Sequence, residues 1–232
     1  MNWQHFLVRI EHTYYTEVLM TALRVVVLIV SLRGKRQGYT RYLSILTLVS
    51  LLQEIVVVYD ELKSNNTLLG KNVSQNTFYP YLIAELTCCL LYIKKSLLSI
   101  RVRKIIPVFI LLFNLYTLIE WLGHPSSPDF YLSTSTIEGI LIIIACLYFF
   151  YEIFTQRDIK PLLTEHFFWA ISGMLIAFSI ITPAFILINY VTAKSSFLFR
   201  SIYIINNAAY SLLFISFIIA IYYDKKLKCK NR

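Results

Sequence analysis

The sequence has few charged residues, few glycines and prolines, and few cysteines. Charged residues make up only 15% of its 232 positions, whereas soluble domains carry about 25%. Six glycines and six prolines are too few for a linker-rich or low-complexity protein. The four cysteines, at positions 88, 89, 146 and 229, have no metal-binding spacing and imply no disulfide framework. These shortages exclude both an ordinary soluble domain and a disulfide-rich one.

Catalytic patterns are also missing. The metalloprotease pattern H-E-x-x-H, the hydrolase pattern G-x-S-x-G and the phosphate-binding P-loop do not occur. The histidines, at positions 5, 12, 124 and 166, lie at or beyond the ends of the apolar runs, and no histidine is placed to activate Cys88 or Cys89. We therefore predict that the protein is not an enzyme and holds neither a metal nor a cofactor.

Long apolar runs account for most of the chain. Hydrophobic residues make up 57% of the sequence, and about 20 apolar residues in a helix cross the ~30 Å core of a bilayer. This predicts an all-α fold, a bundle of seven transmembrane helices that forms one membrane domain over residues 1–232. The predicted spans cover residues 14–32, 42–59, 79–98, 104–122, 135–155, 166–189 and 199–223. We expect Pro80 and Pro107 in the first turns of the third and fourth spans, where a missing N–H is tolerated.

The basic residues predict the orientation of these spans. A net charge of +9 would suggest nucleic acid as a partner of a soluble protein, but here the charges fall between apolar runs. Sixteen of the 22 basic residues lie on one side, in three loops (33–41, 94–104 and 157–160) and the tail 225–232. Five lie on the other side. The positive-inside rule therefore predicts an external N-terminus, a cytoplasmic C-terminus and no nucleic-acid partner. The loop 60–78 is then external and polar, and the Ile/Lys/Asn/Tyr-rich composition indicates a bacterial inner membrane.

Several polar side chains lie inside the spans, and most fall in the outer third. At ~1.5 Å per residue, Glu54 and Glu85 each lie roughly 8 Å from the outer ends of their spans. Arg24 lies seven residues after Glu17, and hence on the same helical face. The full set of candidate ligand-binding residues is Glu17, Arg24, Glu54, Glu85, Glu120, Glu138, Asn206 and Asn207.

Two interpretations of this set stay open. In the first, Arg24 pairs with one or two of the carboxylates and the asparagines cross-link helices, so the groups are structural. In the second, the groups line a cavity that binds a small polar or cationic ligand. The excess of acid over base favours a cation, a protonated carboxyl, or both. A proton- or cation-coupled transport route is less favoured, because no matching polar groups continue to the inner face.

From the fifth span onward the chain resembles a group of integral membrane proteins of Bacteroidota with no assigned activity. The resemblance covers about half the chain. It rests on Glu138, the aromatic run 148–151, Phe168-Trp169 with Gly173, and Asn206-Asn207, and more loosely on Glu85. One departure is Ile176-Ala177, where the group tends to have a tyrosine. Members often accompany sensor-kinase genes, which implies signalling by association.

These observations together predict a receptor-like sensor with a polar, acidic site in the outer half of the bundle. Because no soluble output domain is visible in the sequence, we expect a membrane or cytoplasmic protein partner that contacts residues 94–104 and 225–232. The alternatives are a structural or assembly subunit of a membrane complex and a small transporter.

Overall fold

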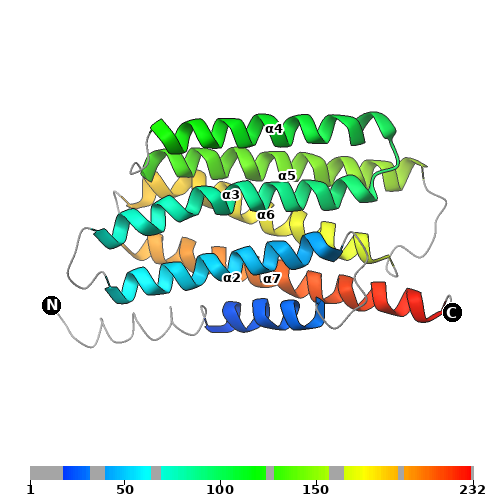
Figure 1. The fold of residues 1–232 in the computed structure, drawn as a ribbon, viewed down its shortest axis with the longest axis horizontal. Helices are drawn as coiled ribbons and strands as arrows, with labels where there is room; N and C mark the ends of the chain where they lie inside the picture. The colour runs from blue at the N-terminus through cyan, green and yellow to red at the C-terminus, as the bar shows by residue number, and fades with distance from the viewer. Residues whose placement is uncertain are drawn as a thin grey trace.

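The described part of the chain is a bundle of helices (Figure 1). The computed structural model describes residues 18–31, 40–63, 69–123, 128–156, 165–192 and 196–230. The helices are Val18–Ser31, α2 (Thr40–Lys63), α3 (Leu69–Ser96), α4 (Ile100–Gly123), α5 (Pro128–Gln156), α6 (His166–Thr192) and α7 (Ser196–Lys230). The prediction of an all-helical fold is confirmed.

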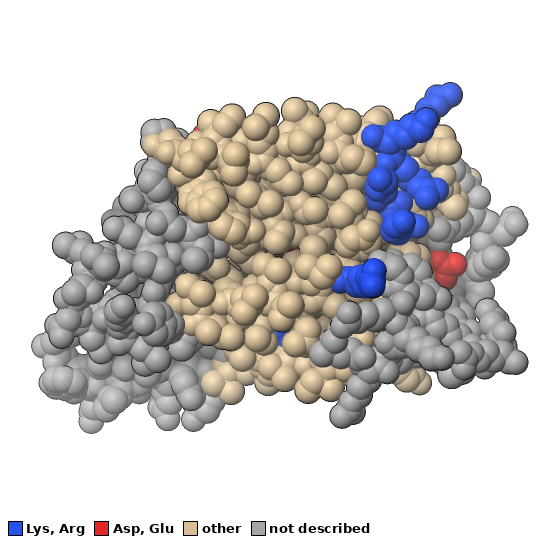
Figure 2. Space-filling model, in the orientation of Figure 1, with Lys and Arg blue, Asp and Glu red and all other residues tan. Residues whose placement is uncertain are grey.

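Five of the described helices, α2, α4, α5, α6 and α7, are long and apolar enough to cross a membrane. This is the pattern of a multi-pass membrane protein. The outside of the bundle agrees with it: in α4, Leu111, Leu115 and Leu122 face outward with exposed fractions of 67%, 53% and 75%. Figure 2 shows a broad, almost uncharged middle, with lysine and arginine gathered at one end. The prediction of seven spans requires Val18–Ser31 and α3 to cross as well.

The helices pack in an order that brings distant parts of the chain together. α3 contacts α2, α4 and α5, while α6 lies against both α5 and α7. α4 lies at one rim of the bundle and Val18–Ser31 at the other (Figure 1). Fully buried side chains such as Leu86, Ile142, Ile171 and Phe217 form the core between α3, α5, α6 and α7.

Two glycines allow close helix contacts in this core. A Cβ at Gly139 of α5 would collide with the side chain of Thr182 on α6, and a Cβ at Gly173 of α6 would collide with Ser216 on α7. Small residues at such crossings are typical of membrane helices, because association in lipid depends on close packing. At Gly139 and Gly173, the backbone of one helix therefore lies directly against a side chain of the next, which holds α5, α6 and α7 close together.

Several helices extend beyond the predicted spans. α3 begins at Leu69, so much of the loop predicted over 60–78 is helical. Pro80 therefore lies inside α3 and not in its first turn. α4 begins at Ile100, so Pro107 also lies beyond the first turn of its helix, contrary to the prediction. α5 begins before residue 135 and α7 runs beyond residue 223. Polarity marks where a span leaves the bilayer, but a helix continues beyond that point until its sequence stops it, because extending a formed helix costs little.

Candidate functional site

A cavity of about 260 Å³ opens among five helices at the end of the bundle opposite the α3–α4 connection. Val18–Ser31, α2, α3, α6 and α7 all contribute side chains to its wall. The polar lining consists of Arg24, Ser50, Gln53, Glu54, Asn206 and Asn207, and the aromatic lining of Phe78, Tyr81, Phe185 and Tyr210. The cavity is slightly smaller than the ~300–1,000 Å³ of drug-sized ligand sites, so its volume suits a small molecule.

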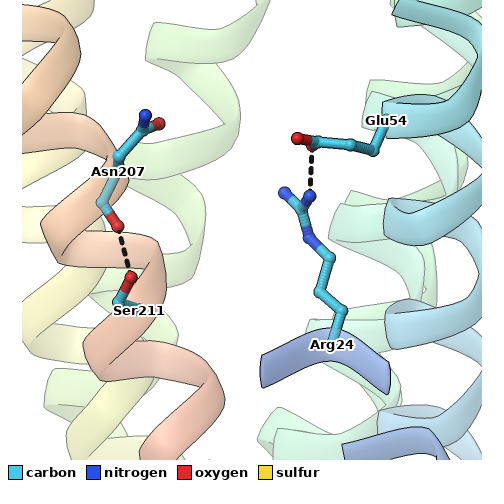
Figure 3. A network of polar contacts seen from close by, with 4 residues as sticks. All are labelled: Arg24, Glu54, Asn207 and Ser211. Carbon is cyan, nitrogen blue, oxygen red and sulfur yellow. Dashed lines mark hydrogen bonds and ion pairs between the residues drawn. The ribbon is translucent and has the colours of Figure 1, made fainter. Parts of the chain in front are cut away.

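An ion pair forms one wall of the cavity. The guanidinium of Arg24 donates to the carboxylate of Glu54, which joins Val18–Ser31 to α2 (Figure 3). The same guanidinium lies 5.4 Å from the ring centroid of Phe214 on α7, within range of a cation–π contact. Arg24 therefore ties three helices together at the cavity.

Two further carboxyl groups lie behind the tyrosines. Glu85 of α3 is buried and accepts hydrogen bonds from the phenols of Tyr81 and Tyr210, both of which line the cavity. Glu138 of α5 is equally buried and interacts electrostatically with Glu85. Within the described residues its Oε1 atom has no hydrogen-bond partner. Arg24 thus interacts with the carboxyl groups of Glu54 and Glu85, and Glu138 adds a third carboxyl group beside Glu85.

The structure brings together most of the residues selected from the sequence. Arg24, Glu54, Asn206 and Asn207 line the cavity, and Glu85 and Glu138 lie next to it as described above. Asn207 is buried, and its backbone oxygen accepts a hydrogen bond of 2.8 Å from Ser211 (Figure 3).

One of the selected residues that the structure describes does not join this group. Glu120 is half-buried on α4, which does not contribute to the lining. Within the described segments its Oε2 atom has no hydrogen-bond partner. Glu17 lies outside the described residues.

Sequence reasoning missed the other lining residues, among them the polar side chains of Ser50, Gln53, Tyr81 and Tyr210. The signal that could have found them is helical spacing. Tyr81 precedes Glu85 by four residues, and Tyr210 follows Asn206 by four, so each lies one turn away on the same face.

Glu152 on α5 has a structural role that the sequence did not reveal. Its buried carboxylate accepts hydrogen bonds from the backbone N–H groups of Leu98 and Ser99, at 2.7 and 2.9 Å. These residues immediately precede α4, whose first N–H groups have no partner within the helix. A carboxylate from α5 therefore caps the N-terminus of α4 and fixes the two helices to each other.

We expect Glu152→Ala to lower the free energy of unfolding by about 2 kcal/mol, because two backbone donors lose a charged acceptor. Glu152→Gln keeps one acceptor oxygen and should lose about half as much. Chemical unfolding in detergent, followed by circular dichroism, measures both variants. Equal stability of the wild type and Glu152→Ala would contradict this capping role.

The half of the bundle away from the cavity is closed by large apolar side chains. Tyr92, Phe149, Ile171, Phe217 and Ile221 are each 2% exposed or less. Cys89 and Cys146 are buried and free. Among the described residues, no group of three or more histidine, cysteine, aspartate or glutamate side chains is arranged to hold a metal ion.

No family model, curated protein or solved structure matches this chain. A proposal for its function therefore rests on the geometry and chemistry of the cavity.

Proposed function

We propose that the protein is a receptor-like sensor of the bacterial inner membrane that binds a small cationic ligand in this cavity and signals through a partner protein. In this proposal all seven helices span the bilayer, the N-terminus is external and the C-terminus is cytoplasmic. The cavity then opens toward the external side. The observation that carries the proposal is that an ion pair and aromatic rings line the same cavity.

The chemistry of the lining favours an organic ammonium ion. Aromatic faces attract cations, and Phe78, Tyr81 and Phe185 supply such rings at the wall. Glu54 supplies a carboxylate, while the amides of Asn206 and Asn207 offer acceptors for N–H donors. A small amine with an apolar body can contact each of these groups.

Ligand exchange at Glu54 provides a route for a signal. A ligand ammonium that binds Glu54 competes with Arg24, whose guanidinium links Val18–Ser31, α2 and Phe214 of α7. Loss of that link changes how these helices are held together, and α7 continues to Lys230 at the far end of the bundle. The ligand shifts the equilibrium between the paired and the released state of Arg24 only as far as it binds the released state more tightly.

The packing of the opposite half favours a sensor over a transporter. A transport route needs polar groups or a channel beyond the cavity, whereas Tyr92, Phe149 and Phe217 are buried at that depth. A ligand that reaches the cavity therefore meets closely packed large side chains beyond it.

A thermal-shift assay on the purified full chain tests this proposal. The probes are tetramethylammonium, choline and 1,4-diaminobutane, with 3,3-dimethylbutanol as the neutral isostere of choline. We expect at least one cation to stabilise the wild type by about 2.7 kcal/mol at 100 times its Kd, which is roughly 5–10 °C in Tm. Glu54→Gln and Glu85→Gln should remove that shift.

Glu152→Gln is the matched control, because it makes the same chemical change at a buried glutamate far from the cavity. It should lower the Tm of the free protein and leave the ligand shift intact. If no cation stabilises the wild type, or if 3,3-dimethylbutanol stabilises it as strongly as choline, the cationic site is wrong. If Glu54→Gln and Glu85→Gln then change the stability of the protein but no response to a ligand, the structural-subunit interpretation is supported.

A further inference from the structure

A second, fully apolar groove lies at the other end of the bundle, where α3 passes into α4. Its volume is about 210 Å³, and its wall comes from α3, α4, α5 and the α3–α4 connection. The lining residues that define its course are Leu90, Leu97, Val102, Phe109, Ile144 and Tyr148. From Val102 to Phe109 the groove follows α4 for ~10 Å, at 1.5 Å per residue.

Basic side chains surround one end of this groove. Arg101 and Arg103 flank the lining residue Val102, and Lys104 precedes the lining residue Ile105; all three basic side chains are exposed. Lys94 and Lys95 lie in the last turn of α3, next to the same connection. Figure 2 shows the resulting concentration of positive charge at this end of the molecule.

This positive charge is not neutralised by the described part of the protein. None of these five side chains forms an ion pair with another described residue. The nearest acid along the connection, Glu152, already accepts hydrogen bonds from the backbone of Leu98 and Ser99. The groove therefore has an apolar wall and, at one end, a rim of basic side chains that have no ion-pair partner among the described residues.

We propose that this groove binds an anionic phospholipid, with one acyl chain along α4 and the phosphate against Arg101, Arg103 and Lys104. Basic sites beside grooves between membrane helices recognise anionic lipid head groups in this way. An acyl chain matches the apolar wall, and the phosphate supplies the missing negative charge.

A second copy of the chain fits the groove less well. A two-fold dimer through this face would place the same cationic rims of both copies near each other, and like charges across an interface oppose association. The lipid satisfies both the apolar wall and the charge, so it is the occupant that the chemistry selects.

Native mass spectrometry of the purified full chain in a neutral detergent tests this proposal. Phosphatidylglycerol and phosphatidylcholine with identical acyl chains are titrated separately. We expect tighter binding of phosphatidylglycerol, and each neutralised charge should weaken it about fivefold, from ~1 kcal/mol per basic residue at a membrane surface. Arg103→Gln should therefore bind about fivefold more weakly, and the triple Arg101→Gln/Arg103→Gln/Lys104→Gln variant about a hundredfold more weakly.

Two further variants separate the groove from general surface charge. Arg41→Gln removes an exposed arginine at the start of α2, outside the groove, and should leave the affinity unchanged. Ala145→Phe fills the groove from α5 and should weaken phosphatidylglycerol binding without any change in net charge. Should Ala145→Phe fail to fold, the comparison of Arg103→Gln with Arg41→Gln decides alone.

Three results would overturn the lipid site. The first is equal affinity for the two phospholipids. The second is an equal loss of phosphatidylglycerol affinity in Arg41→Gln and Arg103→Gln. The third is competition by inorganic phosphate at the concentration of the lipid, which would indicate a bare anion site. A dimer that Ala145→Phe dissociates without effect on lipid binding would assign the groove to a second copy. None of these outcomes bears on the proposed cation-binding cavity at the opposite end of the bundle.

Discussion

Arg24→Met is expected to lower the free energy of unfolding by about 3–5 kcal/mol, the range for a buried pair that loses one partner. The change leaves the carboxylate of Glu54 without its cation in a site where the two side chains are only 19% and 7% exposed, for Glu54 and Arg24 respectively. It also removes the cation–π contact with Phe214 on α7. Unfolding of the purified protein in detergent, followed by circular dichroism, measures the loss.

A double-mutant cycle with Glu54→Gln identifies the cause of this loss. Arg24→Met/Glu54→Gln should recover most of the stability, because no buried charge is then left unpaired. Arg41→Met, the same change at an exposed arginine, should stay within about 0.5 kcal/mol of the wild type. Additive losses in the double variant would show that the two side chains do not act as a pair.

The same variant connects the ion pair to the proposed ligand. In Arg24→Met, the carboxylate of Glu54 has no internal competitor, so a cationic probe should bind more tightly than to the wild type. The stability lost with Arg24 should then return on addition of the probe that stabilises the wild type. A structural ion pair with no ligand site shows the loss without the recovery.

The helices were predictable from the sequence because each apolar run is both long and continuous. In a run such as 135–155, the backbone must satisfy its own hydrogen bonds in lipid, and a helix does this within one segment. The grouping of Arg24, Glu54, Asn206 and Asn207 followed from depth alone. Once spans alternate in direction, polar groups near the same membrane surface are at the same height in the bundle.

Depth did not predict which helices are neighbours. Glu120 of α4 has a depth similar to that of the cavity residues, but α4 lies at the rim of the bundle and makes its main contact with α3. Tyr81 and Tyr210 were missed because tyrosine near a span end is also typical of the lipid–water interface. Only the structure shows that both phenols reach Glu85, that of Tyr81 from the same helix and that of Tyr210 from α7.

The cap on α4 was hidden for a different reason. Glu152 lies far from Leu98 and Ser99 in the sequence, and nothing in a single chain indicates that α5 passes beside the start of α4. Helix ends were equally hard to place. Pro80 alone suggests a helix start, whereas neighbouring helices allow a proline inside α3, as is common in membrane proteins.

Gly173→Leu is expected to cost about 3 kcal/mol of stability, at the upper end of the range for overpacking a close-packed core. A Cβ at this position already collides with the Cβ and Oγ atoms of Ser216, and it reaches the backbone Cα of Leu213 at 3.8 Å. The Ser216 hydroxyl cannot turn away freely, because it donates a hydrogen bond of 2.7 Å to the carbonyl of Leu213. The strain must therefore be relieved by separation of α6 from α7.

Gly123→Leu is the matched control, because a Cβ at Gly123 meets nothing within 4 Å. That variant should be at least as stable as the wild type, since leucine favours a helix more than glycine does. The milder change Gly173→Ala should be partly rescued by Ser216→Gly, which removes the colliding side chain from α7. If Gly173→Leu and Gly123→Leu unfold at the same denaturant concentration, the close contact between α6 and α7 does not hold the bundle together. Because Asn206, Asn207 and Tyr210 reach the cavity from α7, a loosened α6–α7 contact should also weaken the binding of any cation that stabilises the wild type.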